Sequence, residues 1–573
     1  MIDYSFFPNV GISALELYFP QRCIDMQKFE IIPEDKGKFT KGLGQERMCF
    51  TDEKEDAVSF ALTVTKRLLQ KTKVDPKAIS YLGVGTESGV DHSKSIKTFL
   101  MRLFDGNPNI RGLDSTNACF GGTETLFNAV DHVTIHGGYA IAVATDVALY
   151  GGPSESAQPT GGAGAVAMLI TPNAPLVIER LRSFACDDEF DFWKPDSSHE
   201  YPVVNGPLSL NCYLRGLDLC FENMQQKTQE LRMHCKKIGE KEPPPFSLSQ
   251  FSHFLFHSPY HGMVKKAYSR LLFLERHSQI QLQTQSGDSV DSGMPFSKEL
   301  KWDEFSCCDG MSLSDTLKSN EYKVAASAML KRKDAEFEEK VMPSAFLPKK
   351  TGNSYTASVF FALASLLHNQ MEIENPLAKL REDTSKESRT NDDNKKEIEL
   401  EKRRMKRVLC YSYGSGFVSA LWTIRVNEKA ELSGKPSIST SESASHCSVN
   451  ADLPSSSSSS SVQPSTPSLS SYVDSFPECN HSFTIHSLLQ SMAHIDELLA
   501  NRKEMELVDF KAAVASREKY YNKVGWSTTS QDANVANVCF EPNWNKYFSK
   551  GVFYLKEITD DRRRIYEEYD GSK

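Results

Sequence analysis

Three residues of this sequence combine a reactive side chain with a place at the end of a predicted element, and the first is Cys119. It lies in the stretch N-A-C-F-G-G-T, directly before an apolar helical pattern. A thiol at the start of a helix is expected to have a lowered pKa, because free backbone N–H groups and the helix dipole stabilise the thiolate. Gly121 and Gly122 leave room for a ligand. Cys119 is therefore a candidate nucleophile, whereas a lone cysteine in a tight turn is more often a packed residue.

Glu87 and His257 are the candidate proton-transfer groups. Glu87 follows the strand-like run Y-L-G-V-G-T, and His257 closes the apolar run F-S-H-F-L-F-H before a Ser-Pro turn. A carboxylate at the end of a buried strand is either solvated or functional, and a buried histidine is often only a satisfied core residue. The turn Y-S-Y-G-S-G around Ser415 offers backbone N–H groups for half of an oxyanion hole, or else is a simple hairpin.

The elements that would position these residues alternate between strand and helix. Between residues 80 and 172 the pattern predicts strands at 81–86, 139–145 and 164–170, and helices at 95–104 and from 120 to 137. The second half predicts strands at 251–257 and on both sides of Gly414, and helices at 263–274 and 354–367. Alternation of this kind predicts an α/β fold around a largely buried sheet.

The totals exclude several classes of protein. A chain of 573 residues is too long for one hydrophobic core, and its net charge of -9 argues against a partner made of nucleic acid. No apolar run approaches the roughly 18 residues that span a bilayer, so we expect no membrane segment. The 13 cysteines contain no C-x-x-C pair, which predicts neither a disulfide framework nor a zinc site. The N-terminus resembles neither a secretory signal nor an Arg-rich transit peptide, so a cytoplasmic protein is expected.

Two polar segments look foreign to the core. Residues 378–406 are almost wholly charged and polar, which predicts a solvated helix or a disordered insert. Residues 430–478 include seven consecutive serines and several prolines, a composition that cannot bury enough apolar surface to fold.

Other motifs favour weaker alternatives. P-T-G-G-A-G-A at residues 159–165 lacks the lysine of a phosphate-binding loop, and G-S-G at 414–416 is not a nucleophile elbow. A Cys-His protease is possible in principle, because Cys119 and His257 are its two residue types, but no protease signature surrounds either residue.

Taken in order, the motifs resemble those of the 3-hydroxy-3-methylglutaryl-CoA synthases, a family of the thiolase superfamily. The resemblance is carried by V-G-I-S-A-L-E-L-Y-F-P, K-F-T-K-G-L-G-Q, V-G-T-E-S, D-H-S-K-S-I-K-T, N-A-C-F-G-G-T, P-T-G-G-A-G-A-V-A, F-D-F-W-K-P-D, F-H-S-P-Y, G-N-S-Y-T-A-S-V and Y-S-Y-G-S-G. It runs from Val10 to about Val426 and resumes weakly near the C-terminus.

The resemblance implies a duplicated thiolase-like fold of five layers, αβαβα, interrupted by disordered inserts. An N-terminal half at residues 1–182 would hold Glu87 and Cys119, and a C-terminal half at 183–573 would hold His257. The family condenses acetyl-CoA with acetoacetyl-CoA and water, early in the mevalonate route to sterols and isoprenoids. Cys119 would carry the acetyl group, Glu87 would move protons, and His257 would polarise the acetoacetyl carbonyl. The backbone N–H groups of Cys119 and Ser415 would stabilise the enolate.

Further residues match family positions that line the acyl pocket or contact CoA: Lys38, Asp146, Tyr150, Thr160, Asp191, Ser209, Lys266, Asn353 and Ser415. One departure is Gly262, where the family usually has a second lysine after H-S-P-Y, so one CoA phosphate contact is expected to be lost or supplied from elsewhere. The resemblance implies a homodimer that uses CoA thioesters as substrates and needs neither a cofactor nor a metal.

Two rivals remain at this stage. Another condensing enzyme of the superfamily is one, although a thiolase would place a second catalytic cysteine near the C-terminal glycine turn, and here Cys410 lies inside the preceding strand. The other is a non-catalytic scaffold whose polar inserts bind partners, an idea disfavoured by the joint presence of Cys119, Glu87 and His257.

Overall fold

The fold was analysed in a computed structural model that describes residues 9–196, 198–286, 303–382, 391–428, 483–528 and 544–572. Its centre is a mixed sheet with the strand order β12-β13-β14-β8-β1-β7-β6-β4-β5, and β9 pairs with β14. The strands are β1 (Gly11–Tyr18), β4 (Ile79–Gly85), β5 (Asp114–Ser115), β6 (Tyr139–Ala148), β7 (Gly162–Thr171), β8 (Leu176–Ile178), β9 (Ser183–Cys186), β12 (His253–Phe256), β13 (Arg407–Gly414) and β14 (Val418–Val426). The strands of the two halves are therefore joined through the short β8, which pairs with β1 on one side and β14 on the other.

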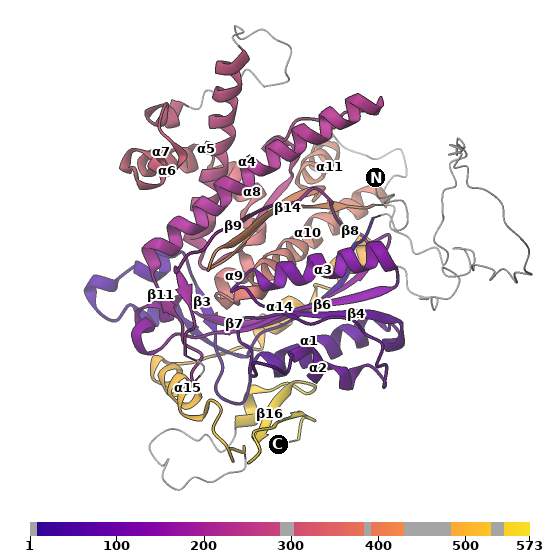
Figure 1. Cartoon of the computed structure of the whole chain (residues 1–573), viewed down its shortest axis with the longest axis vertical. Helices are drawn as coiled ribbons and strands as arrows, with labels where there is room; N and C mark the ends of the chain where they lie inside the picture. Colours follow the sequence, from indigo (N-terminus) through magenta and orange to yellow (C-terminus); the bar gives the residue numbers. More distant parts are fainter. Residues whose placement is uncertain are drawn as a thin grey trace, which may run out of the picture.

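Helices lie on both sides of the strands and between their two sets (Figure 1). They are α1 (Ala57–Thr72), α2 (Ile96–Leu100), α3 (Gly121–His136), α4 (Gly206–Ile238), α5 (His261–Ser286), α9 (Phe346–Thr351) and α10 (Ser358–Glu382). In Figure 1, α4 lies above β9 and β14, α3 and α10 lie between these strands and β6 and β7, and α1 lies below.

The alternation of side chains along each strand explains this layering. In β6, Ile141 and Val143 pack with α1, whereas Ala142 and Ala144 face the opposite core, which contains α3 and α10. In β13, Cys410 faces that same middle core, whereas its neighbour Tyr411 faces the core formed with α4 and α5. Successive side chains point to opposite faces and are apolar at these positions, so both strand sets are buried on both faces. The result is the five-layer αβαβα arrangement that the resemblance implied.

The predicted elements around the candidate residues are present. The strands predicted at 81–86, 139–145, 164–170 and 251–257 correspond to β4, β6, β7 and β12, and those around Gly414 to β13 and β14. The helix predicted from residue 120 is α3, which ends at Gly137. The sequence alone did not show where His257 and Ser415 lie relative to each other. His257 follows β12 and Ser415 follows β13, and because these two strands are paired and parallel, both residues lie at the same edge of the sheet.

The last part of the chain packs against the N-terminal half. Helix α15 (Leu507–Tyr520) places Phe510 in the core around α1, at 5.1 Å from the ring of Phe50. The short strand β15 (Lys503–Glu504) pairs in parallel with β2 (Arg22–Asp25), and the hairpin β16 (Phe553–Ile558)–β17 (Arg564–Glu568) covers α1. These segments form the lower edge of the molecule in Figure 1. The division of the chain at residues 182 and 183 stays a prediction.

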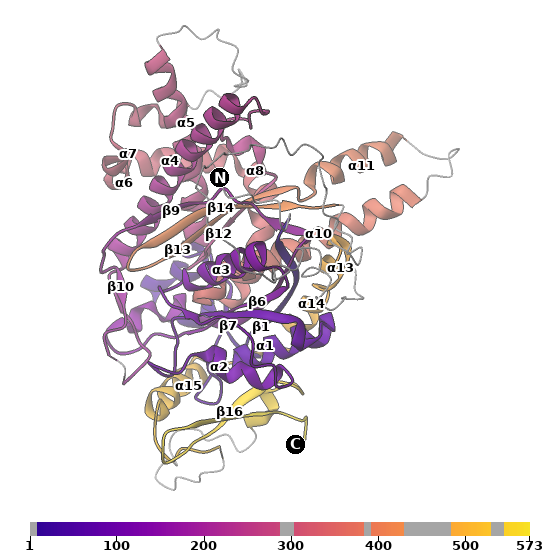
Figure 2. The same ribbon diagram turned by 45° about the vertical axis from the view of Figure 1, so that its right-hand side comes forward.

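The first polar insert is largely helical where the structure describes it, which confirms the solvated-helix alternative over disorder for those residues. Within residues 378–406, α10 continues to Glu382 and a separate helix α11 covers Asn391–Arg403. Figure 2 shows both helices projecting from the body. Acidic residues in the first turn of α11 and basic residues in its last turn match the helix dipole, so a charged sequence is compatible with a solvated helix. The second insert, residues 430–478, lies outside the described residues.

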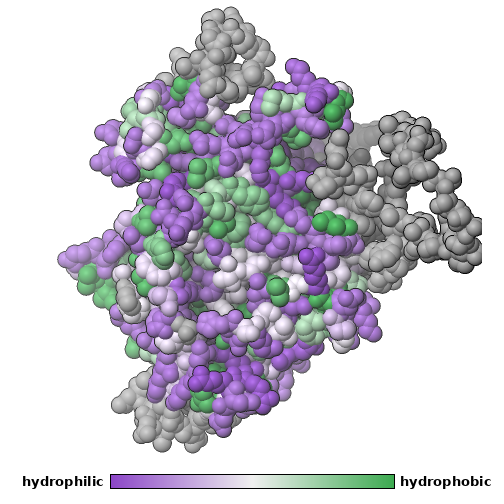
Figure 3. All heavy atoms as spheres, in the orientation of Figure 1, coloured by the Kyte–Doolittle hydropathy of each residue, from purple (hydrophilic) through white to green (hydrophobic). Residues whose placement is uncertain are grey.

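The surface drawn in Figure 3 is mostly hydrophilic, with hydrophobic residues in separate groups. Among the residues that the structure describes, no helix combines the length and the apolar character needed to cross a bilayer.

Candidate active site

Glycines bring the backbone of the Cys119 turn against the end of β4. A Cβ on Gly121 would lie 2.6 Å from the carbonyl oxygen of Ser115, and one on Gly85 would overlap the backbone of Gly121 and Gly122. Only residues without a side chain allow this close approach. Cys119 follows directly on Ala118, whose φ of +42° lies in the left-handed region. Such a conformation in alanine is unfavourable and is found mainly at functional turns.

This packing pairs the Cys119 thiol with the Glu87 carboxylate. The thiol donates a hydrogen bond to Oε1 of Glu87 across 3.2 Å. Cys119 is half-buried, and the side chain of Glu87 is 5% exposed. Burial raises the pKa of Glu87 to about 7, and the ammonium of Lys194 opposes part of that rise. A carboxyl with this pKa can both accept and return a proton near neutral pH.

The pKa of Cys119 differs in direction from the sequence-based expectation. Burial raises the pKa of the Cys119 thiol well above its usual value, and the adjacent Glu87 carboxylate raises it further. The expected lowering by the N-terminus of α3 is therefore outweighed. The resting pair is a thiol hydrogen-bonded to a carboxylate, and the thiolate forms when a base takes the proton.

Asp146 holds the backbone beside Glu87. It is fully buried and accepts hydrogen bonds from the backbone N–H of Glu87 at 2.8 Å and from the hydroxyl of Thr86 at 3.0 Å. The backbone N–H and hydroxyl of Thr356 bind the other carboxylate oxygen. The structure thus gives Asp146 a supporting place, with no side-chain surface exposed to a substrate.

Lys194 is a site residue that sequence reasoning missed. Its ammonium donates a hydrogen bond to the carbonyl oxygen of Glu87 at 3.0 Å and lies 3.8 Å from Oε2 of the same residue. It also lies 5.1 Å from the centre of the Tyr355 ring. Lys194 lies in the motif F-D-F-W-K-P-D, which matches the family, so the motif could have marked it as a candidate site residue. Its contact with Glu87 could not be predicted, because the two residues are 107 positions apart in the chain.

His257 lies at the end of β12, next to the strand that leads to Ser415. Its backbone N–H donates to the carbonyl of Tyr411 at 2.8 Å, and its carbonyl accepts from the hydroxyl of Tyr213 at 2.7 Å. Burial lowers the pKa of His257 to about 3, so the imidazole is neutral near pH 7. A neutral imidazole can donate one N–H to a carbonyl oxygen without carrying a charge.

The turn that contains Ser415 contacts the Cys119 turn directly. The side chain of Asn117 donates to the carbonyl of Ser415 at 3.2 Å, and a Cβ on Gly414 would lie 2.6 Å from the backbone N of Phe120. Asp191 fixes the turn from the other side, because it accepts from the backbone N–H of Gly416 at 2.8 Å. The two backbones whose N–H groups were predicted to form an oxyanion hole are therefore neighbours.

The other predicted binding residues fall into two groups. Tyr150 is buried in a small cluster with Tyr355, against which Cys119 packs, and Asn353 is buried with its side chain accepting from the backbone N–H of Tyr355 at 2.9 Å. The residues Thr160 and Ser209 are half-buried, and Lys38 and Lys266 are exposed. The ammonium of Lys38 pairs with Asp35 at 3.0 Å.

Gly262 allows a loop to pack on the start of α5. Its backbone N–H donates to the carbonyl of Leu43 at 2.7 Å, and a Cβ there would lie 3.0 Å from the carbonyl oxygen of Gly42. A lysine at this position would require the loop to move slightly. In the part of the chain that is described, no group of three or more His, Cys, Asp or Glu side chains is placed to hold a metal ion.

Comparison with known proteins agrees with this geometry. The sequence models for the N-terminal and C-terminal domains of hydroxymethylglutaryl-coenzyme A synthase match residues 7–175 and 176–378. The mitochondrial hydroxymethylglutaryl-CoA synthase of Rattus norvegicus is 32% identical over 97% of this chain and 89% of its own length. The cytoplasmic enzyme of Gallus gallus is 36% identical over 74% of this chain and 72% of its own. A solved structure of MvaS in complex with 3-hydroxy-3-methylglutaryl coenzyme A has a TM-score of 0.63 at 24% identity, covering 98% of this chain and 99% of that one.

The fold is thiolase-like, and the matching family models and relatives define the class as acyl-condensing enzymes. Within that class the chain belongs to the hydroxymethylglutaryl-CoA synthase family.

Proposed function

We propose that this chain condenses acetyl-CoA with acetoacetyl-CoA and water to give 3-hydroxy-3-methylglutaryl-CoA and free CoA, through an acetyl thioester on Cys119. The observation that carries the proposal is the Cys119–Glu87 pair, a thiol 3.2 Å from a carboxyl whose pKa is raised to about 7. This is a nucleophile next to a base that is half ionised near neutral pH.

In the first step the Cys119 sulfur attacks the acetyl carbonyl of acetyl-CoA. The Glu87 carboxylate takes the thiol proton, because it already accepts that hydrogen bond. The carbon–sulfur bond to CoA then breaks, and the leaving thiolate takes that proton back from Glu87 to become free CoA, which returns Glu87 to its carboxylate form. The acetyl group remains on Cys119 as a thioester.

In the second step the acetyl methyl loses a proton to the Glu87 carboxylate. The resulting enolate carbon attacks the ketone of acetoacetyl-CoA, and the new alkoxide recovers a proton from Glu87. A neutral His257 donates its N–H to that ketone oxygen, which suits its pKa of about 3. Backbone N–H groups of the touching Cys119 and Ser415 turns stabilise the enolate oxygen, and water then hydrolyses the thioester.

The burial of Cys410 argues against a thiolase. This cysteine is fully buried between Leu255 and Trp422 in the sheet, so a substrate cannot reach its sulfur, whereas Cys119 is half-buried and bonded to Glu87. A thiol held in this way cannot act as a second catalytic cysteine. The ionisable Glu87 beside Cys119 also argues against a purely structural role for the chain.

The test is a product assay with the purified protein. Given both acetyl-CoA and acetoacetyl-CoA, it should release free CoA and form 3-hydroxy-3-methylglutaryl-CoA at the same rate, and the Cys119→Ala variant should form none. Absence of this product at saturating substrate would overturn the proposal.

We extend the proposal to setting and assembly. The reaction supplies the early mevalonate route to sterols and isoprenoids, in the cytoplasm and as a homodimer, with CoA thioesters as substrates and no cofactor. Support for the location is mixed, because the similar proteins include both cytoplasmic and mitochondrial enzymes. Sedimentation of the purified chain tests the dimer, and imaging of the tagged chain tests the location.

A further inference from the structure

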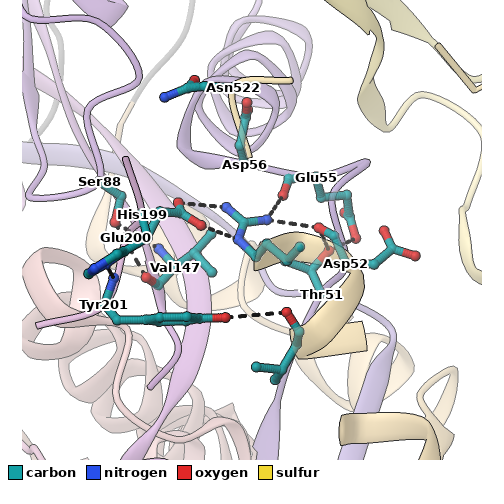
Figure 4. A network of polar contacts seen from close by, with 12 residues as sticks. Thr51, Asp52, Glu55, Asp56, Ser88, Val147, His199, Glu200, Tyr201 and Asn522 are labelled. Atoms are coloured by element: carbon teal, nitrogen blue, oxygen red, sulfur yellow. Dashed lines mark hydrogen bonds and ion pairs between the residues drawn. The ribbon is translucent and has the colours of Figure 1, made fainter. Parts of the chain in front are cut away.

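One buried arginine of the C-terminal segment contacts the active-site side of the molecule without reaching a reacting atom. Arg517 lies on α15 and is 3% exposed. Its guanidinium binds both carboxylate oxygens of Glu200, one of them at 2.8 Å. It also donates to the carbonyl oxygens of Asp52 at 2.8 Å and Glu55 at 2.5 Å, just before α1. These hydrogen bonds, drawn as dashed lines to Glu200, Asp52 and Glu55 in Figure 4, join α15 to two other segments of the chain.

Glu200 belongs to a hairpin that also carries Lys194. The hairpin consists of β10 (Phe192–Trp193) and β11 (Val203–Val204), which pair in antiparallel register with Trp193 opposite Val203. Lys194 directly follows β10, and Glu200 lies shortly before β11. The two arms of the hairpin are therefore joined by the pairing of β10 with β11.

The same helix holds the hairpin at a second point. The hydroxyl of Tyr201 donates to the carbonyl of Val514 at 3.2 Å, and the dashed line from Tyr201 in Figure 4 marks this bond. On its other side the Tyr201 ring packs on Gly151, where a Cβ would lie 2.6 Å from the ring. Gly151 follows Tyr150, which lies in the cluster around Cys119. Helix α15 thus supports a hairpin that touches the site through Tyr201 and Lys194.

We propose that Arg517 is a positioning residue for the condensation: through Glu200 it fixes the β10–β11 hairpin, and the hairpin holds the ammonium of Lys194 against Glu87. The inference rests on the proposed function for its catalytic meaning. A bidentate guanidinium–carboxylate pair sets both distance and angle, which a flexible ammonium does not. Buried in this way, the pair orients the hairpin more than it adds stability.

Loss of the two-point bond between Arg517 and Glu200 should therefore change the pKa of Glu87. The ionisable groups that face Glu87 are Cys119, Lys194 and Asp146, with Tyr150 and Tyr355 close by. Lys194 is the cation that opposes the raised pKa of Glu87, and it opposes the raised pKa of Cys119 as well. When the hairpin moves, the ammonium spends less time beside both groups, and both pKa values rise.

The test measures how fast iodoacetamide alkylates Cys119 at a series of pH values, followed by mass spectrometry of the Cys119 peptide in the full chain. This readout needs no turnover, so it remains valid if the proposed reaction fails. In Arg517→Lys, which keeps the charge and loses the two-point bond, the profile should move up by about half a pH unit. Glu200→Gln should produce the same shift and serves if Arg517→Lys does not fold.

Two comparisons decide whether the effect passes through Lys194. In a Lys194→Met background, Arg517→Lys should cause no further shift, since the ammonium is already absent. The matched control is Arg564→Lys, a partly buried arginine of the same segment that pairs with Asp56 at 3.2 Å, and it should leave the profile in place. A shift that persists in the Lys194→Met background, or thermal destabilisation by Arg517→Lys with an unmoved profile, would overturn the proposal.

Discussion

At the scale of single residues, the site depends on a thiol and a carboxyl that share one proton. Glu87 and Cys119 both have raised pKa values because burial disfavours the charged form of each, and each carries a negative charge when ionised. Loss of the shared proton would leave two negative charges side by side, so only a nearby cation or a bound substrate can favour ionisation of both groups. Lys194 is that cation.

Replacing Glu87 should separate the two halves of the reaction. Glu87→Ala is expected to slow acetylation of Cys119 only modestly, because loss of the carboxylate also removes the negative charge that raises the pKa of the thiol. Condensation should fall by about 10²–10⁴-fold, the range for loss of a general base. Rapid quench with labelled acetyl-CoA measures both steps in one sample. Loss of acetylation together with condensation would mean that Glu87 is needed already for thiolate formation.

Replacing Lys194 should move the pH dependence of condensation. The wild-type rate should rise with pH through about 7, because Glu87 must be ionised to accept a proton. Lys194→Met removes the cation that lowers this pKa, so the acidic limb should move up by about one pH unit. A pH–kcat profile measures it, with Lys556→Met as the control because Lys556 pairs with Glu567 far along the chain. An unmoved limb would show that Lys194 does not act on Glu87.

At the scale of elements, strand ends and glycine turns bring distant residues together. The periodicity of the sequence predicted β4, β6, β7, β12 and α3 correctly, since apolar runs and a Gly-Gly stop are local signals. The contact between the Cys119 turn and the Ser415 turn was not visible in either pattern, because it joins Asn117 to a residue 298 positions away. Only the resemblance to a family placed those two turns in one site.

The close approach of those turns should not tolerate a side chain at position 414. In Gly414→Ala the new Cβ would clash with the carbonyl of Asn117 and lie 2.6 Å from the backbone N of Phe120. Acetylation of Cys119 should fall at least tenfold, and the free energy of unfolding by about 1–3 kcal/mol, as for other overpacked sites.

Gly206→Ala is the matched control for that substitution. A Cβ at position 206 would meet no atom within 4 Å, so acetylation and stability should both be nearly unchanged. Labelling rate and chemical denaturation measure the two variants side by side. Normal acetylation by Gly414→Ala would show that the two turns need not touch.

At the scale of the whole molecule, the C-terminal segment is part of the N-terminal half's core. The resemblance resumed near the C-terminus but did not indicate where this segment packs, since β15 pairs with a strand about 480 residues earlier and Arg517 meets Glu200 across 317 positions. Neither periodicity nor composition carries information over such distances. The missed residues Lys194 and Arg517 are of this kind, whereas Cys119, Glu87 and His257 stand at locally recognisable strand or helix ends.

The burial of α15 should make its core residue important for folding. Phe510 is fully buried between Phe29 and Phe50, so Phe510→Ala should lower the free energy of unfolding by about 3–5 kcal/mol. Val508→Ala, on the same helix and 72% exposed, should change it by less than about 0.5 kcal/mol. Denaturant unfolding compares the two. Equal, small effects would mean that the segment is not integrated with the core.

The central claim is that Cys119 carries the acetyl group, and one measurement tests it directly. Purified protein is incubated with acetyl-CoA alone, quenched in acid, digested and analysed by mass spectrometry. The account predicts one acetyl group on the peptide that contains Cys119, its removal when acetoacetyl-CoA is added, and no label in Cys119→Ala. An acetyl label that persists in Cys119→Ala, or that resides on another residue of the wild type, would contradict it.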